Sequence, residues 1–330
     1  MSYQILDSIR NQNEDSLKEQ FAVDVLNGFS RSPKFLNSKY FYDDKGSLLF
    51  EKITDLEEYY PTKCEFDVFT ENKTQIIDSF GEDFNLIELG AGDGRKTRVL
   101  LEELIKRNTK FTYKPIDISE SAVEKMELNF KESYPELEFS GVVGEYVEAL
   151  SHLTDNSKRK NVVLFLGSNI GNFDWEGSQV FLRILWKHLN PNDLLLVGFD
   201  LKKNIQTLLS AYNDSKGVTS EFNLNILHRI NKDLGGEFDV DQFFHFGTYN
   251  PLKGAMESFL ISKIDQEVYI SDLGKKFHFG EYESIHMEYS SKYTTKQIES
   301  LGQDTGYKML KSFMDQKKFF TDTLFEVEKI

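Results

Sequence analysis

Cysteine is nearly absent from this chain of 330 residues, which contains only Cys64. A disulfide framework within the chain is therefore excluded, and a lone thiol is typical of a reducing compartment, so we expect a cytoplasmic protein. Histidine is scarce as well. The six histidines are scattered along the chain and show no spacing typical of metal ligands. We therefore expect no metal site built by the protein.

The chain has fewer positive than negative side chains. It contains 39 lysines and arginines and 54 aspartates and glutamates, so the formal net charge is −15. Proteins bind nucleic acids and anionic membranes mainly through contacts of basic side chains with phosphates. This balance argues against both kinds of partner and favours a small-molecule substrate. Long apolar runs are missing too, so we expect no membrane span, and the polar, acidic N-terminal stretch does not resemble a secretion signal.

The glycine-rich stretch at residues 90–94, GAGDG, lacks the final glycine of a dinucleotide-binding motif, G-x-G-x-x-G. An apolar stretch that ends in Glu88 precedes it, and a helical pattern begins at Lys96. Glycine lets the backbone approach a ligand closely, and the first N–H groups of a helix attract electronegative groups. The pattern predicts a nucleotide-type cradle around Glu88, Gly90 and Gly92 that suits S-adenosylmethionine better than NAD.

Two further strand ends carry residues that suit this cofactor. Asp117 ends a predicted strand at 111–116 and lies 27 positions after Gly90, where a carboxylate can accept both ribose hydroxyls in a nucleotide-binding βαβ unit. Glu145 and Tyr146 follow a later short apolar stretch, and an acid with an aromatic ring can hold the adenine amino group and ring face. We therefore predict that these three residues bind the cofactor.

The remaining strands predict the fold class. The continuous apolar run NVVLFL at 161–166 is typical of a buried parallel strand, and it leads into a polar loop at 167–172, at the sheet edge where ligands of open α/β sheets bind. A helix over 293–301, opened by a threonine cap, and two strands over 307–315 and 319–327 are expected to follow. A parallel sheet that finishes with a helix and an antiparallel hairpin is the usual ending of class I methyltransferases.

The order of these segments predicts two domains. An α/β, Rossmann-like class I methyltransferase domain that binds S-adenosylmethionine is expected over residues 64–200 and 291–330. A second, α+β domain, built from residues 1–63 and 201–290, is expected to bind the substrate. Because the insertion lies between consecutive core strands, we expect it to project from their carboxyl edge, and its apolar spacing predicts a helix that begins near Val218.

Five segments, in order along nearly the whole chain, resemble the histidine-specific Nα-methyltransferase family: FYDDKGSLLFEKITDLEEYYPTKCE (41–65), IELGAGDGRKTR (87–98), FLGSNIGNF (165–173), AYNDSKGVTSEFNLNIL (211–227) and MEYSSKYT (287–294). The first block is far more specific than the glycine turn. That family carries out the first step of ergothioneine biosynthesis, in which S-adenosylmethionine methylates the α-amino group of L-histidine to form the betaine hercynine. The resemblance implies the same fold, cofactor and substrate, and we expect a monomer.

The resemblance also implies roles for individual residues. The family's cofactor contacts fall on five positions of this chain: Gly90, Lys96, Asp117, Glu145 and Tyr146. Many members carry aspartate where Glu145 stands. The glutamate is one methylene longer, and we expect that it can still accept a hydrogen bond from adenine.

The family's substrate contacts fall on Tyr42, Tyr59, Asn172, Tyr212, Glu288 and Ser290. Asn172 and Tyr212 can donate hydrogen bonds to a carboxylate, and Glu288 and Ser290 suit the two nitrogens of an imidazole ring. Tyr59 can reach the ring or the amine. We expect Tyr59, Asn172 and Tyr212 to support the catalytic step, in which the neutral amine displaces the sulfonium methyl group in line, without a metal.

Ser258 departs from the family pattern, because a larger apolar residue, often methionine, is expected there beside the substrate ring. A wider pocket could admit tryptophan or a histidine derivative, since one methylene discriminates by only about 1–3 kcal/mol. Glu288 argues for histidine, because next to an indole this carboxylate would have a single N–H to accept. A non-catalytic S-adenosylmethionine-binding protein is the other alternative. Without the family pattern, Tyr59 could simply pack at a domain boundary, and Glu288 could be an exposed acid.

Overall fold

The structure is a computed structural model that describes residues 2–10, 14–154 and 159–329. The chain divides into two compact units. The first unit contains Met1–Asn11, Pro61–Lys202 and Lys292–Ile330, and the second contains Gln12–Tyr60 and Lys203–Ser291. The second unit therefore interrupts the first twice, as an N-terminal segment and as an insertion.

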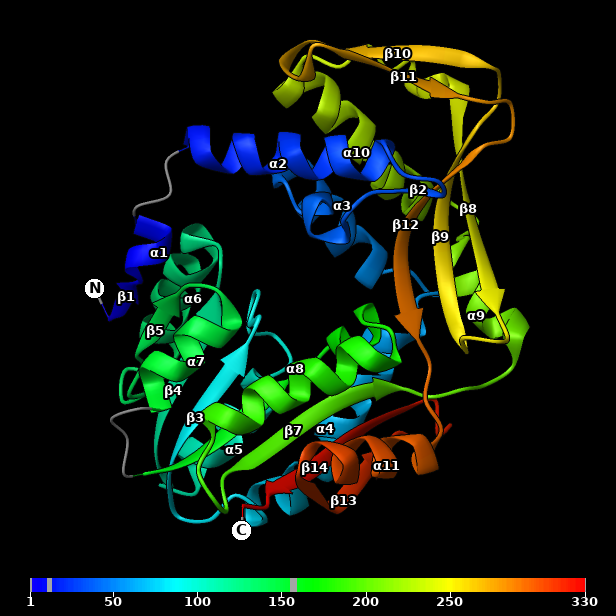
Figure 1. Cartoon of the computed structure of the whole chain (residues 1–330). Coiled ribbons are helices and arrows are strands. Elements are labelled where there is room, and N and C mark those ends of the chain that lie inside the picture. The colour runs from blue at the N-terminus through cyan, green and yellow to red at the C-terminus, as the bar shows by residue number, and fades with distance from the viewer. Residues whose placement is uncertain (1, 11–13, 155–158, 330) are drawn as a thin grey trace. The chain divides into compact units, whose positions relative to one another are not determined.

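The first unit is built on an eight-stranded sheet with the order β1-β5-β4-β3-β6-β7-β14-β13 (Figure 1). Its strands are β1 (Tyr3–Ile5), β3 (Asp83–Leu89), β4 (Lys110–Asp117), β5 (Gly141–Val143), β6 (Lys160–Phe165), β7 (Leu194–Asp200), β13 (Tyr307–Met314) and β14 (Phe320–Val327). In this order, each strand from β1 through β5, β4, β3 and β6 to β7 pairs in parallel with its neighbour. β14 runs antiparallel to both β7 and β13, so the predicted terminal hairpin is confirmed.

Helices cover both faces of this sheet. One face is packed against α4 (Tyr60–Asp78), α5 (Arg98–Lys106) and α6 (Glu120–Ser133), and the other against α7 (Tyr146–Thr154), α8 (Trp175–His188) and α11 (Thr295–Thr305). The short helix α1 (Asp7–Arg10) follows β1. Because successive side chains of a strand point to opposite faces, the neighbours Leu86 and Ile87 of β3 lie in two different apolar clusters.

The strand order places a reversal at β3. The chain runs from β3 to β4 and β5 on one side, and then returns to β6 and β7 on the other side of β3. In open α/β sheets, ligands bind at the carboxyl ends of the strands beside such a reversal. The glycine turn after β3 and the polar loop after β6 therefore lie at the edge where a ligand is expected.

The N-terminal residues differ from the sequence prediction, which assigned all of residues 1–63 to the second domain. β1 instead pairs with β5 at the edge of the large sheet, from Tyr3 opposite Gly141 to Ile5 opposite Val143. A strand of three residues is too short for its hydrophobic period to be recognised.

The second unit contains a four-stranded sheet with the order β2-β12-β9-β8 and a separate hairpin of β10 and β11. The strands are β2 (Lys34–Phe35), β8 (Phe243–Asn250), β9 (Ala255–Ser262), β10 (Gln266–Ile270), β11 (Lys275–Phe279) and β12 (Ser284–Ser291). The helices are α2 (Glu14–Phe29), α3 (Asp44–Thr54), α9 (Ile205–Tyr212) and α10 (Val218–Leu234). α10 begins at the predicted Val218, and its apolar side chains Ile226 and Ile230 share a buried cluster with Leu260 of β9.

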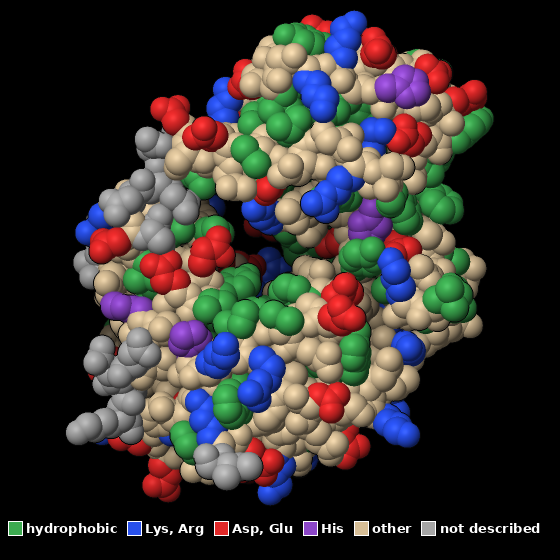
Figure 2. Space-filling view, in the orientation of Figure 1, with side chains coloured by type: hydrophobic (Ala, Val, Ile, Leu, Met, Phe, Trp, Pro, Cys, Tyr) green, Lys and Arg blue, Asp and Glu red, His purple; other side chains and the backbone are tan. Residues whose placement is uncertain are grey.

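Acidic and basic side chains are interspersed on the face of the molecule in Figure 2. Within the residues that the structure describes, no helix is long and apolar enough to cross a membrane. In the same residues, no group of three or more histidine, cysteine, aspartate or glutamate side chains is placed to hold a metal ion.

Candidate active site

The glycine turn follows β3 and takes a backbone that other residues rarely adopt. Gly90, Gly92 and Gly94 have φ angles of 71°, 57° and 66°, in the left-handed region that favours glycine. A Cβ atom on Gly90 would lie 2.5 Å from the Tyr146 hydroxyl oxygen. The turn therefore needs glycine at this position both for its conformation and for the close approach of Tyr146.

Asp117 lies beside this turn. Its carboxylate accepts hydrogen bonds from the backbone N–H groups of Gly92, at 3.1 Å, and of Ser119, at 3.0 Å. Tyr146 is half-buried, and burial, with smaller contributions from the charges of Asp117 and Glu145, raises the pKa of its hydroxyl to about 12. The structure thus gathers Gly90, Gly92, Asp117 and Tyr146 at one end of the sheet, with the exposed Glu145 next to Tyr146.

Glu88 lies buried beneath the turn, with 4% of its surface exposed. Its two oxygens accept hydrogen bonds from the hydroxyls of Thr97, at 2.6 Å, and Tyr113, at 2.5 Å. Burial outweighs these hydrogen bonds and raises the pKa of the carboxyl to about 7. These contacts connect the end of β3 to β4 and to the residue before α5, while direct contact of Glu88 with a cofactor stays a prediction.

Lys96 forms an ion pair with Glu65, a fully buried residue of α4 that was not among the predicted site residues. The other oxygen of Glu65 accepts the backbone N–H of Gly167, at 2.6 Å, in the loop after β6. A Cβ atom on Gly198 of β7 would lie 2.5 Å from this carboxylate. Glu65 therefore connects α4 to the cofactor turn and to the polar loop, in a space that the missing side chain of Gly198 leaves open.

Asp322 of β14 stands next to this ion pair and is fully buried. Among the described residues, neither of its carboxylate oxygens has a hydrogen-bond partner. Burial and the negative charge of Glu65 raise its pKa well above the usual range, although Lys96 acts in the opposite direction. The arrangement places two buried carboxyl groups near one ammonium group, which favours a protonated Asp322.

The loop after β6 carries Asn172. Ser168 has a φ of 56°, and its hydroxyl accepts the backbone N–H of Asp200, at 3.1 Å. The loop continues as a 3-10 turn, η2 (Asn169–Asn172), where the Ile170 carbonyl accepts from the Tyr293 hydroxyl at 3.2 Å. These contacts fix the loop at the carboxyl edge of the sheet and leave the predicted substrate residue Asn172 exposed in the first unit.

The other predicted substrate residues belong to the second unit. The hydroxyls of Tyr212 and Ser290 are 2.6 Å apart and share a hydrogen bond. The ring of Tyr59 lies edge-on to that of Tyr212, with centroids 6.3 Å apart. Phe50 lies between Tyr59 and Tyr42, with centroid distances of 6.4 Å and 5.5 Å. A continuous series of aromatic rings thus leads from Tyr42 to Tyr212.

Glu288 and Ser258 are direct neighbours across the small sheet. Glu288 of β12 pairs with Ser258 of β9, which in turn pairs with Gly247 of β8. Paired residues of antiparallel strands share a face, as do residues two apart along one strand, so Glu288, Ser258 and Ser290 lie on the same face. Ser258 is 3% exposed. We call Gly247, Ser258 and Glu288 the polar row.

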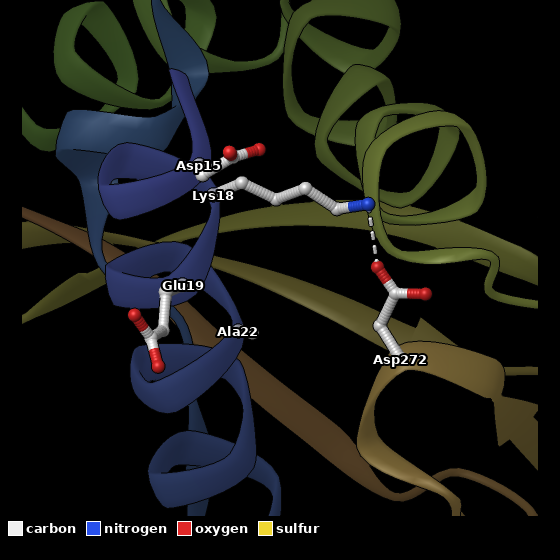
Figure 3. A pocket seen from close by; sticks show the side chains of 5 residues that line it. All are labelled: Asp15, Lys18, Glu19, Ala22 and Asp272. Atoms are coloured by element: carbon white, nitrogen blue, oxygen red, sulfur yellow. Dashed lines mark ion pairs between the residues drawn. The ribbon is translucent and has the colours of Figure 1, made fainter. Parts of the chain in front are cut away.

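One surface hollow, with a volume of about 350 Å³, occurs elsewhere on the second unit (Figure 3). It is lined by Asp15, Lys18, Glu19, Ala22 and Asp272, and Lys18 forms an ion pair with Asp272 at 2.7 Å. No predicted site residue lines it. Its charged groups are well exposed, so we assign no function to it.

Comparison with known proteins identifies the family. The profile described as histidine-specific methyltransferase, SAM-dependent, matches residues 21–327. This chain belongs to that family. The histidine N-alpha-methyltransferase of Mycolicibacterium smegmatis is 35% identical over 284 residues, which cover 86% of this chain and 88% of that protein. Family membership establishes a methyltransferase that depends on S-adenosylmethionine. The mixed main sheet and the second, smaller sheet form its α/β class I fold.

Other similar proteins carry names that point to different amino-acid chemistry. The 4-dimethylallyltryptophan N-methyltransferase easF of Arthroderma benhamiae is 24% identical over 323 residues, which cover 94% of this chain and 93% of that protein. Ergothioneine biosynthesis protein 1 of Neurospora crassa is 35% identical over 205 residues, covering 62% of this chain and 23% of that protein. The family therefore establishes an amino-acid N-methyltransferase, and the choice of amino acid needs a further argument.

A signal for Glu65 was present in the sequence. Glu65 precedes Val68 and Phe69 by three and four positions, so it lies on the buried stripe of α4. A charged residue on such a stripe needs a buried partner. The partner, Lys96, lies 31 positions away, and helical spacing alone could not identify it.

Proposed function

We propose that the protein transfers methyl groups from S-adenosylmethionine to the α-amino group of L-histidine and forms the trimethylated betaine hercynine. The observation that carries the proposal is the shared face on which Glu288, Ser290 and the Tyr212 hydroxyl lie. A carboxylate and a hydroxyl complement the two nitrogens of an imidazole ring. The 35% identity to a histidine N-alpha-methyltransferase over most of both chains supports the same substrate.

The residues around the glycine turn fit S-adenosylmethionine as the methyl donor. Gly90 leaves its backbone accessible where any side chain would collide with Tyr146. Asp117 would accept the ribose hydroxyls, Glu145 and Tyr146 would hold the adenine, and Lys96 would face the polar part of the molecule. When bound, this cofactor supplies an electrophilic methyl group on a sulfonium ion.

The protein's contribution to the reaction is chiefly placement. Asn172 and Tyr212 would hold the substrate carboxylate, and Glu288 and Ser290 would hold the ring, which leaves the amine as the one group free to react. Alignment of reacting groups can supply roughly 7–11 kcal/mol of the barrier reduction. The amine must be neutral to react, so its proton passes to water or to a tyrosine hydroxyl before each transfer.

The second transfer makes the amine bulkier, and the third makes it permanently cationic. The rings of Tyr59 and Tyr212, whose centroids are 6.3 Å apart, offer faces and hydroxyl oxygens that stabilise a cation. The amine and the carboxylate are bonded to the same carbon atom, so Tyr212, which would hold the carboxylate, can also lie beside the amine, and we assign Tyr59 to the amine as well. Replacing both by phenylalanine keeps the rings and removes the hydroxyls, so the yield of the trimethylated product should fall.

Methylation of a larger aromatic amino acid is the second candidate. Ser258 favours it, because a small, buried residue stands next to Glu288 in the polar row where the family pattern suggests a larger one. The similarity to a 4-dimethylallyltryptophan N-methyltransferase favours it as well. Glu288 opposes it, since an indole offers that carboxylate only one N–H group.

The deciding experiment incubates the purified protein with S-adenosylmethionine and a panel of amino acids, and identifies the products by mass spectrometry. We expect L-histidine to gain three methyl groups and to lose trimethylamine on fragmentation. Methylation of tryptophan with histidine unchanged would reject the first candidate in favour of the second. Cofactor binding without methylation of any amino acid would reject both.

A further inference from the structure

Tyr212 is the last residue of α9, a position where backbone carbonyl groups lack hydrogen-bond partners within the helix. The following residue, Asn213, leaves the helical conformation with a φ of −139°. Tyr212 nevertheless has a defined place, because its hydroxyl shares a hydrogen bond with Ser290. Groups outside the helix also hold the backbone at this end.

Asn213 supplies the first of these groups. Its side-chain amide donates to the carbonyl of Leu209, at 2.9 Å, and to the carbonyl of Gly247, at 3.1 Å. Its side-chain oxygen accepts the backbone N–H of Gly247, at 3.0 Å. One amide group thus binds both backbone groups of a residue in the middle of β8 and also closes the last turn of α9.

His245 supplies the second group. Its Nε2 lies 3.0 Å from the backbone carbonyl of Tyr212, and because a carbonyl can only accept, the proton must be on Nε2. Burial lowers the pKa of this imidazole, an effect that the hydrogen bond to Tyr212 reduces. A neutral His245 therefore satisfies a carbonyl that the end of the helix leaves open.

Gly247 makes this contact possible. A Cβ atom there would lie 2.9 Å from both side-chain atoms of the Asn213 amide and 3.0 Å from the Tyr212 carbonyl oxygen. Gly247 is also the β8 member of the polar row, next to Ser258 and two strands from Glu288. The end of α9 therefore lies against the same face of the sheet that carries the side chains of Ser258 and Glu288.

We propose that Asn213 and His245 are positioning residues that set the place of the Tyr212 hydroxyl over the polar row, and that Gly247 is required for this. This inference rests on the proposed function, in which Tyr212 contacts the substrate. The tyrosine is then held at both ends: its backbone is fixed to β8, and its hydroxyl is fixed to Ser290 of β12. Displacing the backbone would move the hydroxyl away from the substrate without removing a group that touches it.

The test compares Asn213→Ala with Asn204→Ala, which removes a cap from the other end of the same helix. The Asn204 side chain accepts from the backbone N–H groups of Gln206 and Thr207, so this control loosens α9 without touching Tyr212. We expect Asn213→Ala to raise the KM for L-histidine roughly tenfold. The KM for S-adenosylmethionine should stay within about twofold, and Asn204→Ala should leave both constants within about twofold. Equal effects of the two variants on the KM for histidine, or no effect of Asn213→Ala, would overturn the proposal.

A second pair of variants removes no hydrogen-bonding group and decides the matter if Asn213→Ala fails to fold. Gly247→Ala pushes against Asn213 and Tyr212, whereas a Cβ atom on Gly280 would meet its neighbours at 3.9 Å or more. We expect the KM for histidine to rise in Gly247→Ala and to stay unchanged in Gly280→Ala. An unchanged KM in Gly247→Ala would contradict the proposal.

The variant Tyr212→Phe distinguishes a failure of the proposed function from a failure of this inference. If Tyr212→Phe leaves the KM for histidine unchanged, the assignment of Tyr212 to the substrate is wrong. If Tyr212→Phe raises that KM while Gly247→Ala and Asn213→Ala do not, the positioning role alone is wrong. If the panel of amino acids identifies another substrate, the same constants are measured with that amino acid.

Discussion

The two units hold their predicted site residues in different ways. In the first unit, the predicted cofactor residues follow the ends of successive parallel strands, and backbone groups in tight turns contribute as much as side chains do. In the second unit, the predicted substrate residues come from distant segments, and side chains such as Tyr212 and Ser290, 78 positions apart, make the contacts. A cofactor site of the first kind leaves a local pattern in the sequence, and a substrate site of the second kind does not.

The largest expected effect is in the first unit. Glu65→Gln keeps an acceptor for the Gly167 N–H but removes the charge that pairs with Lys96. Removing one partner of a buried ion pair costs about 3–5 kcal/mol, so we expect a marked loss of thermal stability and weaker binding of S-adenosylhomocysteine by calorimetry. The control is Glu71→Gln on the same helix, where Glu71 makes an exposed hydrogen bond to Gln316. If Glu65→Gln kept the affinity and stability of the wild type, the ion pair of Glu65 with Lys96 would stabilise neither the glycine turn nor the loop after β6.

The pH dependence of stability provides the next test of the first unit. Burial raises the pKa of Glu88 from 4.5 to about 7, so between these values the folded protein holds a proton that the unfolded chain has lost. The contribution of Glu88 to stability therefore falls as the pH rises from about 4.5 to 7, by about 3 kcal/mol in total. Glu88→Gln cannot titrate. Denaturation at pH 5 and pH 8 should show the variant gaining stability relative to wild type at the higher pH. Parallel pH profiles for the two proteins would contradict this assignment.

These two tests concern residues that the sequence described incompletely. The strands β3, β4 and β6 and the terminal hairpin were predicted within a few residues, because continuous apolar runs and glycine turns are local signals. The buried carboxylates were not, since Glu65 and Asp322 are adjacent only after folding. The pairing of Glu288 with Ser258 depends on a sheet register that includes an irregularity between His286 and Glu288. Only the resemblance to a family brought these substrate residues together from the sequence.

The second unit is tested by Glu288→Gln. A hydrogen bond to a charged group contributes about 1.5–3 kcal/mol, so loss of the charge should raise the KM for L-histidine by roughly 10- to 150-fold. The affinity for S-adenosylhomocysteine should not change, because the cofactor residues belong to the first unit. Glu267→Gln, an exposed acid on β10, provides the control. If Glu288→Gln lost as much affinity for the cofactor as for histidine, cofactor binding and substrate binding would not be divided between the two units.

The smallest expected effect is a change of substrate selectivity, caused by a substitution in the polar row of the second unit. Ser258→Met places a larger apolar side chain between Gly247 and Glu288 in the polar row. A difference of this size in an apolar pocket changes discrimination by about 1–3 kcal/mol, so the ratio of kcat/KM for histidine to that for tryptophan should rise about 10- to 200-fold. Competition between the two amino acids for S-adenosylmethionine measures this ratio directly. An unchanged ratio would mean that Ser258 does not border the ring. Selectivity would then depend on Glu288, because its charge distinguishes the two nitrogens of imidazole from the single N–H of indole.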